Sequence, residues 1–240
     1  MRNISTMMQR EIGAYFLSPI AYVVLAIFLF ASGLAFALGT FAPGAEASLR
    51  SLCEFWMVLI LVFVLPMLTM RLFSEEFRMG TIETLLTVPI TEREVVLGKF
   101  LGAFAVYGIF LAALLLFPIL LGAYGNVDVL LLVCNYLGLI LLGALYIAVG
   151  LFFSAMTKHQ IIAVLLSFVL LALLTFAFQG LSQKIEIGWL RVFFQQLSIQ
   201  THFGDFVRGV VDLNRVTFFL STTGLFLFLT VKRLEMRRWQ

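Results

Sequence analysis

The sequence predicts an all-α polytopic membrane protein with six transmembrane helices and several shorter helices at the ends of the spans. Of the 240 residues, 62% are hydrophobic and 12% are charged, and the mean hydropathy is +1.08. An average soluble chain is about 45–50% apolar and about 25% charged. With 26 Phe against 13 acidic residues, the chain cannot build a water-soluble surface. A soluble enzyme is therefore excluded, and lipid is the expected solvent.

Six stretches of the sequence contain no Asp, Glu, Lys or Arg. They are residues 12–45, 55–70, 100–127, 129–157, 159–183 and 216–231. A helix needs about 17–25 apolar residues to cross a bilayer, and helices satisfy their own backbone groups in lipid. The two shorter stretches can lengthen because Arg71, Arg215 and Lys232 can extend their charged heads to the interface. Within a single domain covering residues 1–240, the expected spans are about 19–41, 54–72, 98–122, 129–153, 160–181 and 214–232.

The distribution of Lys and Arg predicts that both termini are cytoplasmic. Positive residues collect on the cytoplasmic side of membrane proteins. With both termini inside, the inside carries eleven cations and the outside five. The inside set is Arg2, Arg10, Arg71, Arg78, Arg93, Lys99, Lys158, Lys232, Arg233, Arg237 and Arg238; the outside set is Arg50, Lys184, Arg191, Arg208 and Arg215. An even number of spans agrees with this orientation.

Residues 1–18 are expected to form an amphipathic helix on the inner membrane surface. Apolar residues recur at helical spacing through Ile4, Met7, Met8, Ile12, Tyr15 and Phe16, and such a stripe is typical of an interfacial helix. Ser18-Pro19 then turns the chain into the first span. That span is longer than the apolar core of a secretory signal, so it is expected to remain uncleaved. The alternative is a disordered start that runs directly into the span.

Residues 73–95 are expected to form a cytoplasmic elbow with a coupling helix between the second and third spans. The second span continues as helix to Met79, where Gly80 can take the left-handed conformation that ends a helix. A short helix is expected to follow. Its apolar stripe is Ile82, Leu85 and Leu86, and Pro89 ends it. Thr91 and Glu94 have the spacing of a capping box for the next helix. The alternative is a hairpin that packs on lipid headgroups.

The segment 184–213 is expected to form two amphipathic helices outside the membrane that pack on the fifth and sixth spans. Their apolar stripes are Ile187, Leu190, Phe194 and Leu197, then Phe203, Phe206, Val207 and Val210. An ordinary surface loop is the alternative. Cys53 and Cys134 lie near the outer ends of two spans, where two buried apolar thiols are favoured over a bridge.

Several kinds of chemistry have no motif in the sequence. Gly98-Lys99 lacks the earlier glycine of a phosphate-binding loop and is followed by Phe100. His159 and His202 lie far apart, so no metal site is expected. Ion-coupled carriers usually place ionisable groups near the midplane, and none is expected here. If the protein moves a solute, the energy is expected to enter from outside the membrane portion.

The elbow resembles that of ABC-2 type transporter permeases. The resemblance lies in Phe73-Ser74-Glu75-Glu76, in Arg78 to Leu86, in Val88-Pro89-Ile90 and in Gly98-Lys99. The layout of an amphipathic start, six spans and paired outer helices is also similar and covers nearly the whole chain. The segment 201–212, Thr-His-Phe-Gly-Asp-Phe-Val-Arg-Gly-Val-Val-Asp, resembles the gliding-motility-associated group within that family.

The resemblance implies the membrane half of an ABC exporter or flippase. Two permease subunits, a second copy or a paralogue, would form the pathway, and a dimeric cytoplasmic ATPase would bind ATP and Mg; this chain would be no enzyme and would need no cofactor of its own. The implied ATPase-coupling residues are Glu75, Glu76, Arg78, Gly80, Thr81, Ile82, Glu83, Leu85, Leu86 and Pro89. The implied extracytoplasmic gate is Phe194, Phe203, Phe206 and Val207. An auxiliary membrane protein with a large outer domain is a further implied partner.

Two other classes of function stay open from the residues themselves. A secondary carrier is disfavoured by the missing midplane charges, and a membrane scaffold or signal transducer would move no solute. Retention of a dimeric cytoplasmic ATPase in detergent would favour the permease over both. Apolar spans suit a lipid, a lipid-linked molecule or another amphipathic substrate, membrane lipid is an expected neighbour, and no nucleic acid is expected.

Overall fold

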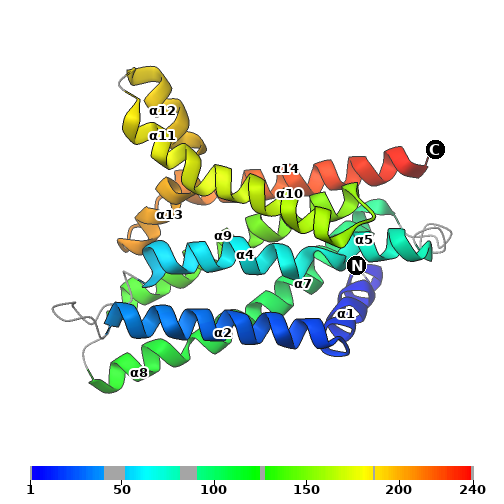
Figure 1. Cartoon of the computed structure of the whole chain (residues 1–240), viewed down its shortest axis with the longest axis horizontal. Helices are drawn as coiled ribbons and strands as arrows, with labels where there is room; N and C mark the ends of the chain where they lie inside the picture. The colour runs from blue at the N-terminus through cyan, green and yellow to red at the C-terminus, as the bar shows by residue number, and fades with distance from the viewer. Residues whose placement is uncertain (1, 41–51, 82–90, 125–127, 186, 239–240) are drawn as a thin grey trace.

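The computed structural model describes residues 2–40, 52–81, 91–124, 128–185 and 187–238, and no strand occurs among them. The helices are α1 (Arg2–Phe16), α2 (Pro19–Thr40), η1 (Leu52–Met57), α4 (Val58–Thr69), α5 (Arg71–Met79), α7 (Glu92–Leu114), α8 (Leu116–Tyr124), α9 (Val129–Met156), α10 (Gln160–Ala172), η2 (Leu173–Ala177), α11 (Phe178–Lys184), α12 (Gly188–Leu197), α13 (Ile199–Val207) and α14 (Leu213–Arg238). The segments η1 and η2 are π-helical. Figure 1 shows the long helices lying roughly side by side.

Six helical stretches are long and apolar enough to cross a membrane. They are Pro19–Leu38, Phe55–Met79, Glu92–Gly122, Val129–Met156, Gln160–Lys184 and Leu213–Met236. The prediction of an all-α polytopic protein with six spans is confirmed. Several of these stretches join two helices: α7 gives way to α8 just before Pro118, whose missing N–H removes one helical hydrogen bond.

The bundle forms around α9. This helix packs against α4, α5, α7, α10, α13 and α14. Glycines on α9 allow the close approach, because a Cβ at Gly143 would overlap the Tyr107 ring and one at Gly138 would lie 2.8 Å from Phe206 Cβ. The buried Tyr107 hydroxyl donates to the Leu139 carbonyl at 2.8 Å.

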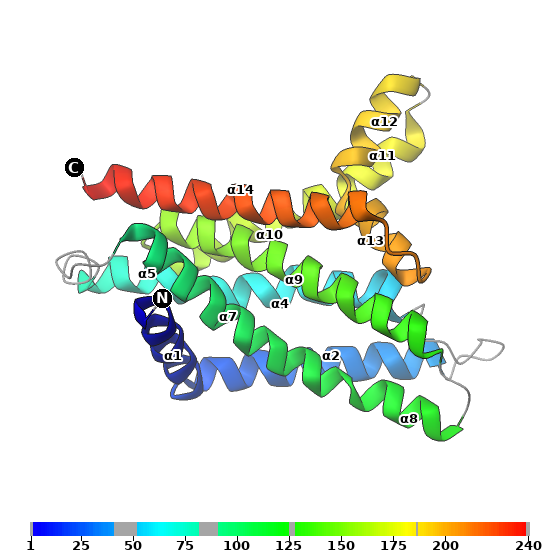
Figure 2. The ribbon, with the colours of Figure 1, turned by 180° about the vertical axis from the view of Figure 1, so that it is seen from behind.

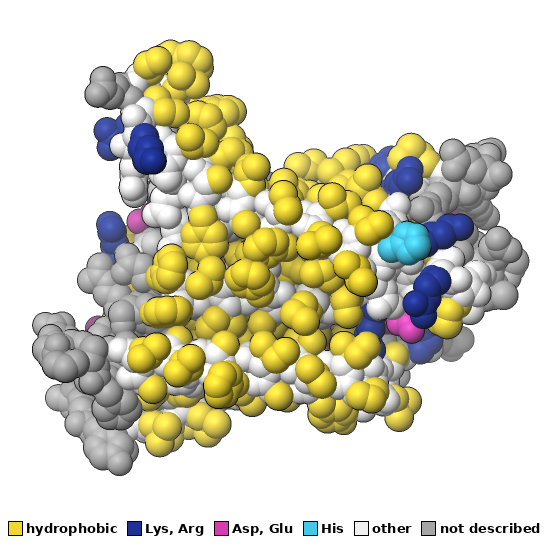
Figure 3. Space-filling view, in the orientation of Figure 1, with side chains coloured by type: hydrophobic (Ala, Val, Ile, Leu, Met, Phe, Trp, Pro, Cys, Tyr) yellow, Lys and Arg dark blue, Asp and Glu magenta, His cyan; other side chains and the backbone are white. Residues whose placement is uncertain are grey.

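The outer surface is an apolar band between two polar ends. Large side chains such as Phe30 and Ile161 are about three-quarters exposed. In Figure 3, hydrophobic side chains cover the middle of the bundle, and charged side chains gather at its ends. Exposure of this kind is expected where lipid replaces water as the solvent.

The two ends of the bundle carry different elements. The start of α1 and the last turns of α14 lie at the same end as α5 (Figures 1 and 2). The opposite end carries α13, and there the hairpin of α11 and α12 projects sideways from the bundle. The chain turns away from α10 at η2, and π-helical segments are a common cause of such bends.

The helix α1 lies against the beginning of α7, where two glycines four residues apart remove the side chains that would hold the helices apart. A Cβ at Gly98 would lie 2.6 Å from Met7 Cβ, and one at Gly102 would lie 2.7 Å from Glu11 Cβ. Met7 and Tyr15 of α1 are buried in the protein. Part of the apolar stripe that the sequence assigned to the membrane surface therefore packs on the chain itself.

Gly102→Ala should displace α1, whereas Gly108→Ala on the same helix should be tolerated. Glu11 Cβ is fixed to its own backbone, so α1 must shift, and such overpacking costs about 1–3 kcal/mol. A Cβ at Gly108 would meet nothing within 4 Å. Thermal unfolding and limited proteolysis of α1 in detergent measure both effects. An equal response of the two variants would show that close packing of α1 does not matter.

Candidate functional site: a buried charge cluster at the α5 end

The helix α5 continues the second candidate span and is anchored to α9. The Ser154 hydroxyl accepts from the backbone N–H groups of Phe73 and Ser74 at 3.0 and 3.1 Å and donates to the Met70 carbonyl at 2.9 Å. Phe73 and Phe77 are buried. The first half of the predicted elbow is therefore held on the bundle by its own motif residues.

Local sequence signals at both sides of the elbow are confirmed. The helix α5 ends at Gly80, which has φ of 72° and takes the left-handed conformation. On the other side, Thr91 N–H donates to Glu94 Oε2 at 3.0 Å and Glu94 N–H donates to Thr91 Oγ1 at 3.4 Å. This pair is the predicted capping box.

The predicted coupling residues divide into three groups. Arg78, Gly80 and Thr81 are exposed, and Glu75 is half-buried. Glu76 faces the interior, where it pairs with other charged residues of this chain. The remaining members, Ile82, Glu83, Leu85, Leu86 and Pro89, lie outside the described residues.

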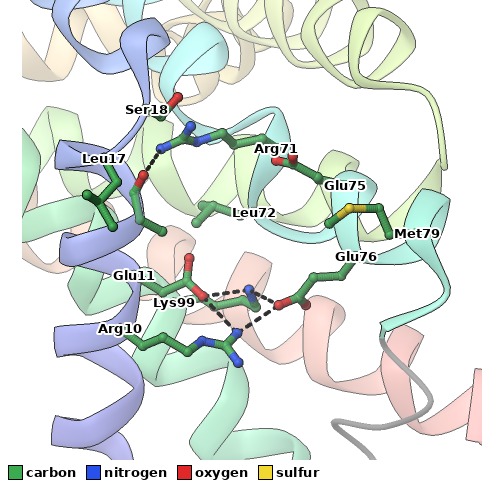
Figure 4. A pocket seen from close by; sticks show the side chains of 11 residues that line it. Arg10, Glu11, Leu17, Ser18, Arg71, Leu72, Glu75, Glu76, Met79 and Lys99 are labelled. Atoms are coloured by element: carbon green, nitrogen blue, oxygen red, sulfur yellow. Dashed lines mark hydrogen bonds and ion pairs between the residues drawn. The ribbon is translucent and has the colours of Figure 1, made fainter.

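Glu76 belongs to a charge cluster formed with Arg10, Glu11 and Lys99. Lys99 Nζ lies 2.8 Å from Glu11 Oε1 and 2.9 Å from Glu76 Oε1. Arg10 Nη2 lies 2.8 Å from the same Glu76 oxygen and 3.2 Å from that of Glu11. Figure 4 shows the four side chains converging from α1, α5 and α7. The cluster therefore joins three helices that are distant in sequence.

The cluster is balanced, and three of its four side chains are largely withdrawn from solvent, whereas the Arg10 side chain is half-exposed. The Lys99 side chain is 1% exposed, against 10% for Glu11 and 14% for Glu76. Two cations face two carboxylates, which is the condition under which charge can be buried. Lys99 Nζ also lies 5.2 Å from the centre of the Phe73 ring, an additional cation–π contact.

A second set of contacts fixes α1 next to the cluster. The Tyr15 hydroxyl donates to the Leu68 carbonyl at 2.8 Å, and Arg71 Nη2 donates to the Ala14 carbonyl at 3.2 Å. The Arg71 guanidinium lies over the Tyr15 ring at 4.4 Å. Burial raises the pKa of Tyr15, so the phenol stays a neutral donor. A cavity of about 350 Å³ opens between these contacts and the charge cluster.

This arrangement couples the positions of three helices through charge. No set of three His, Cys, Asp or Glu that could hold a metal occurs among the described residues. Each charged group of the cluster points to another charged group of the same chain. A displacement of α5 must either carry α1 and α7 with it or separate buried charges.

This cluster was not predicted from the sequence. Glu76 was interpreted as a coupling residue and Gly98-Lys99 as part of the family motif, and no buried charge was expected. The missed signal is the pair Gly98 and Gly102 on either side of Lys99, which marks a face of α7 where another helix can approach closely.

At the opposite end, the predicted gate residues are mostly buried. Phe203, Phe206 and Val207 of α13 are 0% exposed, and the first two lie over Gly138 of α9. The ring centre of Phe194, which is half-buried on α12, lies 5.5 Å from that of Phe178. The outer helices were expected to pack on the fifth and sixth spans, but α13 packs chiefly on the fourth.

Cys134 is buried, and its thiol lies 3.6 Å from the Gly209 carbonyl oxygen. The side chain of Cys53 lies outside the described residues.

The fold and this site define a multi-pass membrane protein with a charge cluster that joins α1, α5 and α7. Comparison with protein families is consistent with that class: residues 57–230, which are 174 of the 240, match the model of the ABC-2 family transporter proteins. The chain belongs to the ABC-2 family of transporter proteins. A comparison with curated proteins gives no match. The match includes α5 and α7 but not α1, so Arg10 and Glu11 lie outside the matched segment.

Lys99→Met should destabilise the protein strongly, because Glu11 and Glu76 would be left together without the buried cation. Removing one partner of a buried ion pair costs about 3–5 kcal/mol. Adding Glu11→Gln and Glu76→Gln to Lys99→Met should restore much of the loss by removing the unpaired charges. The measurement is the free energy of unfolding in detergent.

The matched control is Lys158→Met, since Lys158 is exposed at the turn between α9 and α10. Its unfolding free energy should change by less than about 0.5 kcal/mol. Equal losses in Lys99→Met and Lys158→Met, or no rescue by the added amides, would contradict a buried cluster held together by charge.

Proposed function

We propose that the chain is the permease subunit of an ABC exporter or flippase, driven by ATP and Mg bound to a separate cytoplasmic ATPase dimer. Family membership supports the transporter class. The observation that carries the proposal is the placement of α5. This helix extends the second span at one end of the bundle, and Ser154 and the charge cluster hold it against the other helices. A soluble motor that moves the elbow would thereby move the spans.

The α5 end faces the cytoplasm in this proposal. The ends of α1 and α14 lie at this end in Figures 1 and 2, and eleven of the sixteen Lys and Arg fall on the same side when both termini are inside. Such an excess is typical of the cytoplasmic face. An inner bacterial membrane is the proposed location.

The proposed ATPase contact is the elbow. In the sequence, Ile82, Leu85 and Leu86 have the spacing of an apolar helical stripe, the kind of surface that enters a groove on a partner. Glu75, Arg78 and Glu83 would act as rim charges, which mainly set orientation and encounter rate. Glu76 would act differently: its carboxylate would carry the motion of the elbow to Lys99 and Arg10 inside the permease.

The transport pathway is proposed to need a second copy or a paralogue of the chain. The α11–α12 hairpin projects beyond the bundle and exposes Trp189, Val192 and Phe193, an apolar surface that this chain leaves uncovered.

The buried rings Phe203 and Phe206 would close the extracytoplasmic end as a gate, with Phe194 and Val207 beside them. The segment 201–212 supports membership of the gliding-motility-associated group and hence an auxiliary outer protein. A lipid-like or amphipathic substrate suits the apolar spans.

Leu85→Asp should release the ATPase or uncouple it while the six spans remain inserted. Apolar anchors in desolvated grooves often contribute 2 kcal/mol or more, so binding should weaken by at least about thirtyfold. Glu83→Ala should be milder, and its effect should depend on salt. The measurement is retention of the ATPase on the purified permease, with a parallel check of membrane insertion.

The control is Val211→Asp, which places the same charge on an exposed apolar residue at the α13 end. The Val211→Asp variant should retain the ATPase fully. In a separate assay, the purified permease without the ATPase should hydrolyse no ATP above background. Full ATPase binding and transport by Leu85→Asp would show that the elbow is an ordinary interfacial hairpin.

A further inference from the structure

A polar cluster at the α13 end joins three helices through the ring of His202. His202 Nδ1 lies 2.9 Å from Arg215 Nη1, and His202 Nε2 lies 2.9 Å from the Gln196 carbonyl oxygen. Arg215 Nε donates to Asp205 Oδ2 at 2.7 Å. The imidazole stacks on Phe218 with 3.9 Å between ring centres. His202 therefore connects α13 to α12 and to α14.

These contacts allow only one protonation state of the ring. A guanidinium has donors and no acceptor, and a carbonyl oxygen accepts and cannot donate. Nδ1 must therefore accept from Arg215, and Nε2 must carry the hydrogen that Gln196 receives. This is the neutral imidazole. A proton added at Nδ1 would face the Arg215 donor at hydrogen-bond distance and place two cations side by side.

The surroundings of the ring oppose protonation. Burial lowers the pKa of His202, and the nearby Arg215 lowers it further, while the bond to Gln196 and the charge of Asp205 act in the opposite direction. Other elements also pack against α13. The titratable side chains of α9 near this end are Cys134 and Tyr136, and η2 has no titratable side chain. In η1, the side chain of Glu54 lies outside the described residues.

The junction of α12, α13 and α14 contains the most buried aromatic residues of this end. Phe203 and Phe206 occupy the same helix as His202 and are 0% exposed against α9. Phe206 also contacts Phe219 of α14, next to the ring that His202 stacks on. If Arg215 leaves the imidazole, α13 loses one of its polar ties to α14 and keeps the ion pair between Arg215 and Asp205, so the positions of these rings depend more strongly on apolar packing.

We propose that His202 is an acid-released latch: the neutral ring ties α12 and α13 to α14, and protonation at Nδ1 expels Arg215 and loosens α13. The proposal rests on the proposed function only for the side of the membrane that α13 faces. If that side is extracytoplasmic, the acidity of the external medium sets the state of the latch, and acid favours opening of the end that Phe203 and Phe206 close.

The sign of the pH dependence follows from the neutral folded form. The unfolded histidine titrates near pH 6.5, and the folded pKa lies below that value. The stabilisation by the latch is therefore complete above about pH 6.5 and is lost as the pH falls towards the folded pKa.

The direct test is nitrogen NMR of the whole chain in lipid nanodiscs with ¹⁵N-labelled histidine. The sequence contains two histidines, and His159 is exposed at the opposite end, so two sets of ring-nitrogen signals are expected. At neutral pH, the His202 set should show the Nε2–H tautomer, and it should titrate below the pH of about 6.5 that is typical of an unfolded histidine. A His202 ring that is protonated on Nδ1 at neutral pH, or that titrates at or above about pH 6.5, would overturn the proposal.

The loosening of α13 on protonation of His202 is tested by hydrogen exchange between about pH 8 and about pH 5, the range over which histidine titrates. Protection factors of amides in α13 should fall about tenfold in acid, the size expected when a hydrogen bond to a charged group is lost. The amides of α9 should change little.

His202→Asn keeps an acceptor oxygen near the position of Nδ1 and cannot be protonated in this range. Its α13 protection should be independent of pH, whereas His159→Asn, the matched control, should keep the full acid-dependent loss. An acid-dependent loss that survives in His202→Asn would show that another group controls the junction. Equal protection of native α13 at both pH values would also overturn the latch. Neither result would bear on ATPase binding at the elbow, so the proposed function is tested separately.

Discussion

A buried ammonium group must be paired, and that requirement at Lys99 organises the α5 end of the protein. An isolated charge in a medium of low dielectric constant is too costly to keep. Lys99 is satisfied only because Glu76 arrives from α5 and Glu11 from α1. Gly98 and Gly102 let α1 approach closely enough for that contact. The positions of α1, α5 and the start of α7 are thus coupled through one ion cluster, and the hydrogen bonds of Ser154, Tyr15 and Arg71 reinforce this coupling.

The two ends of the bundle use polar contacts of the same kind around an apolar middle. One cluster ties α1, α5 and α7, and the other ties α12, α13 and α14 through His202. Between them, helices are joined by packing and by single hydroxyl bonds, such as that between Tyr146 and Thr175 at 2.8 Å. The π-helical segments η1 and η2 lie near the α13 end, and such segments are frequent at functional positions. Polar contacts that join helices at both ends suit a protein in which a movement at one end must be transmitted to the other.

Local features were predictable from the sequence, whereas tertiary pairings were not. Six spans, the left-handed Gly80 and the capping box of Thr91 and Glu94 depend on composition or on neighbours within a few residues. The stripe predicted to run to Val210 ends earlier, because α13 stops at Val207 and Gly209 takes φ of 79°. The contacts of Lys99 join residues 88 and 23 positions apart, and no periodic pattern encodes which distant carboxylates will meet a lysine. For the same reason, the tie of His202 to Arg215 was not foreseen.

The most direct test of the central claim is a distance measurement between α1 and α5 by double electron–electron resonance. Spin labels would replace Ser5 and Arg78, which are both exposed, in a background without Cys53 and Cys134. If the charge cluster locks the two helices together, the distance distribution is narrow in the parent protein and in Lys158→Met, and it broadens in Lys99→Met. An unchanged distribution in Lys99→Met would show that apolar packing alone holds α1 to α5, and the cluster would lose its role as the link between the elbow and the spans.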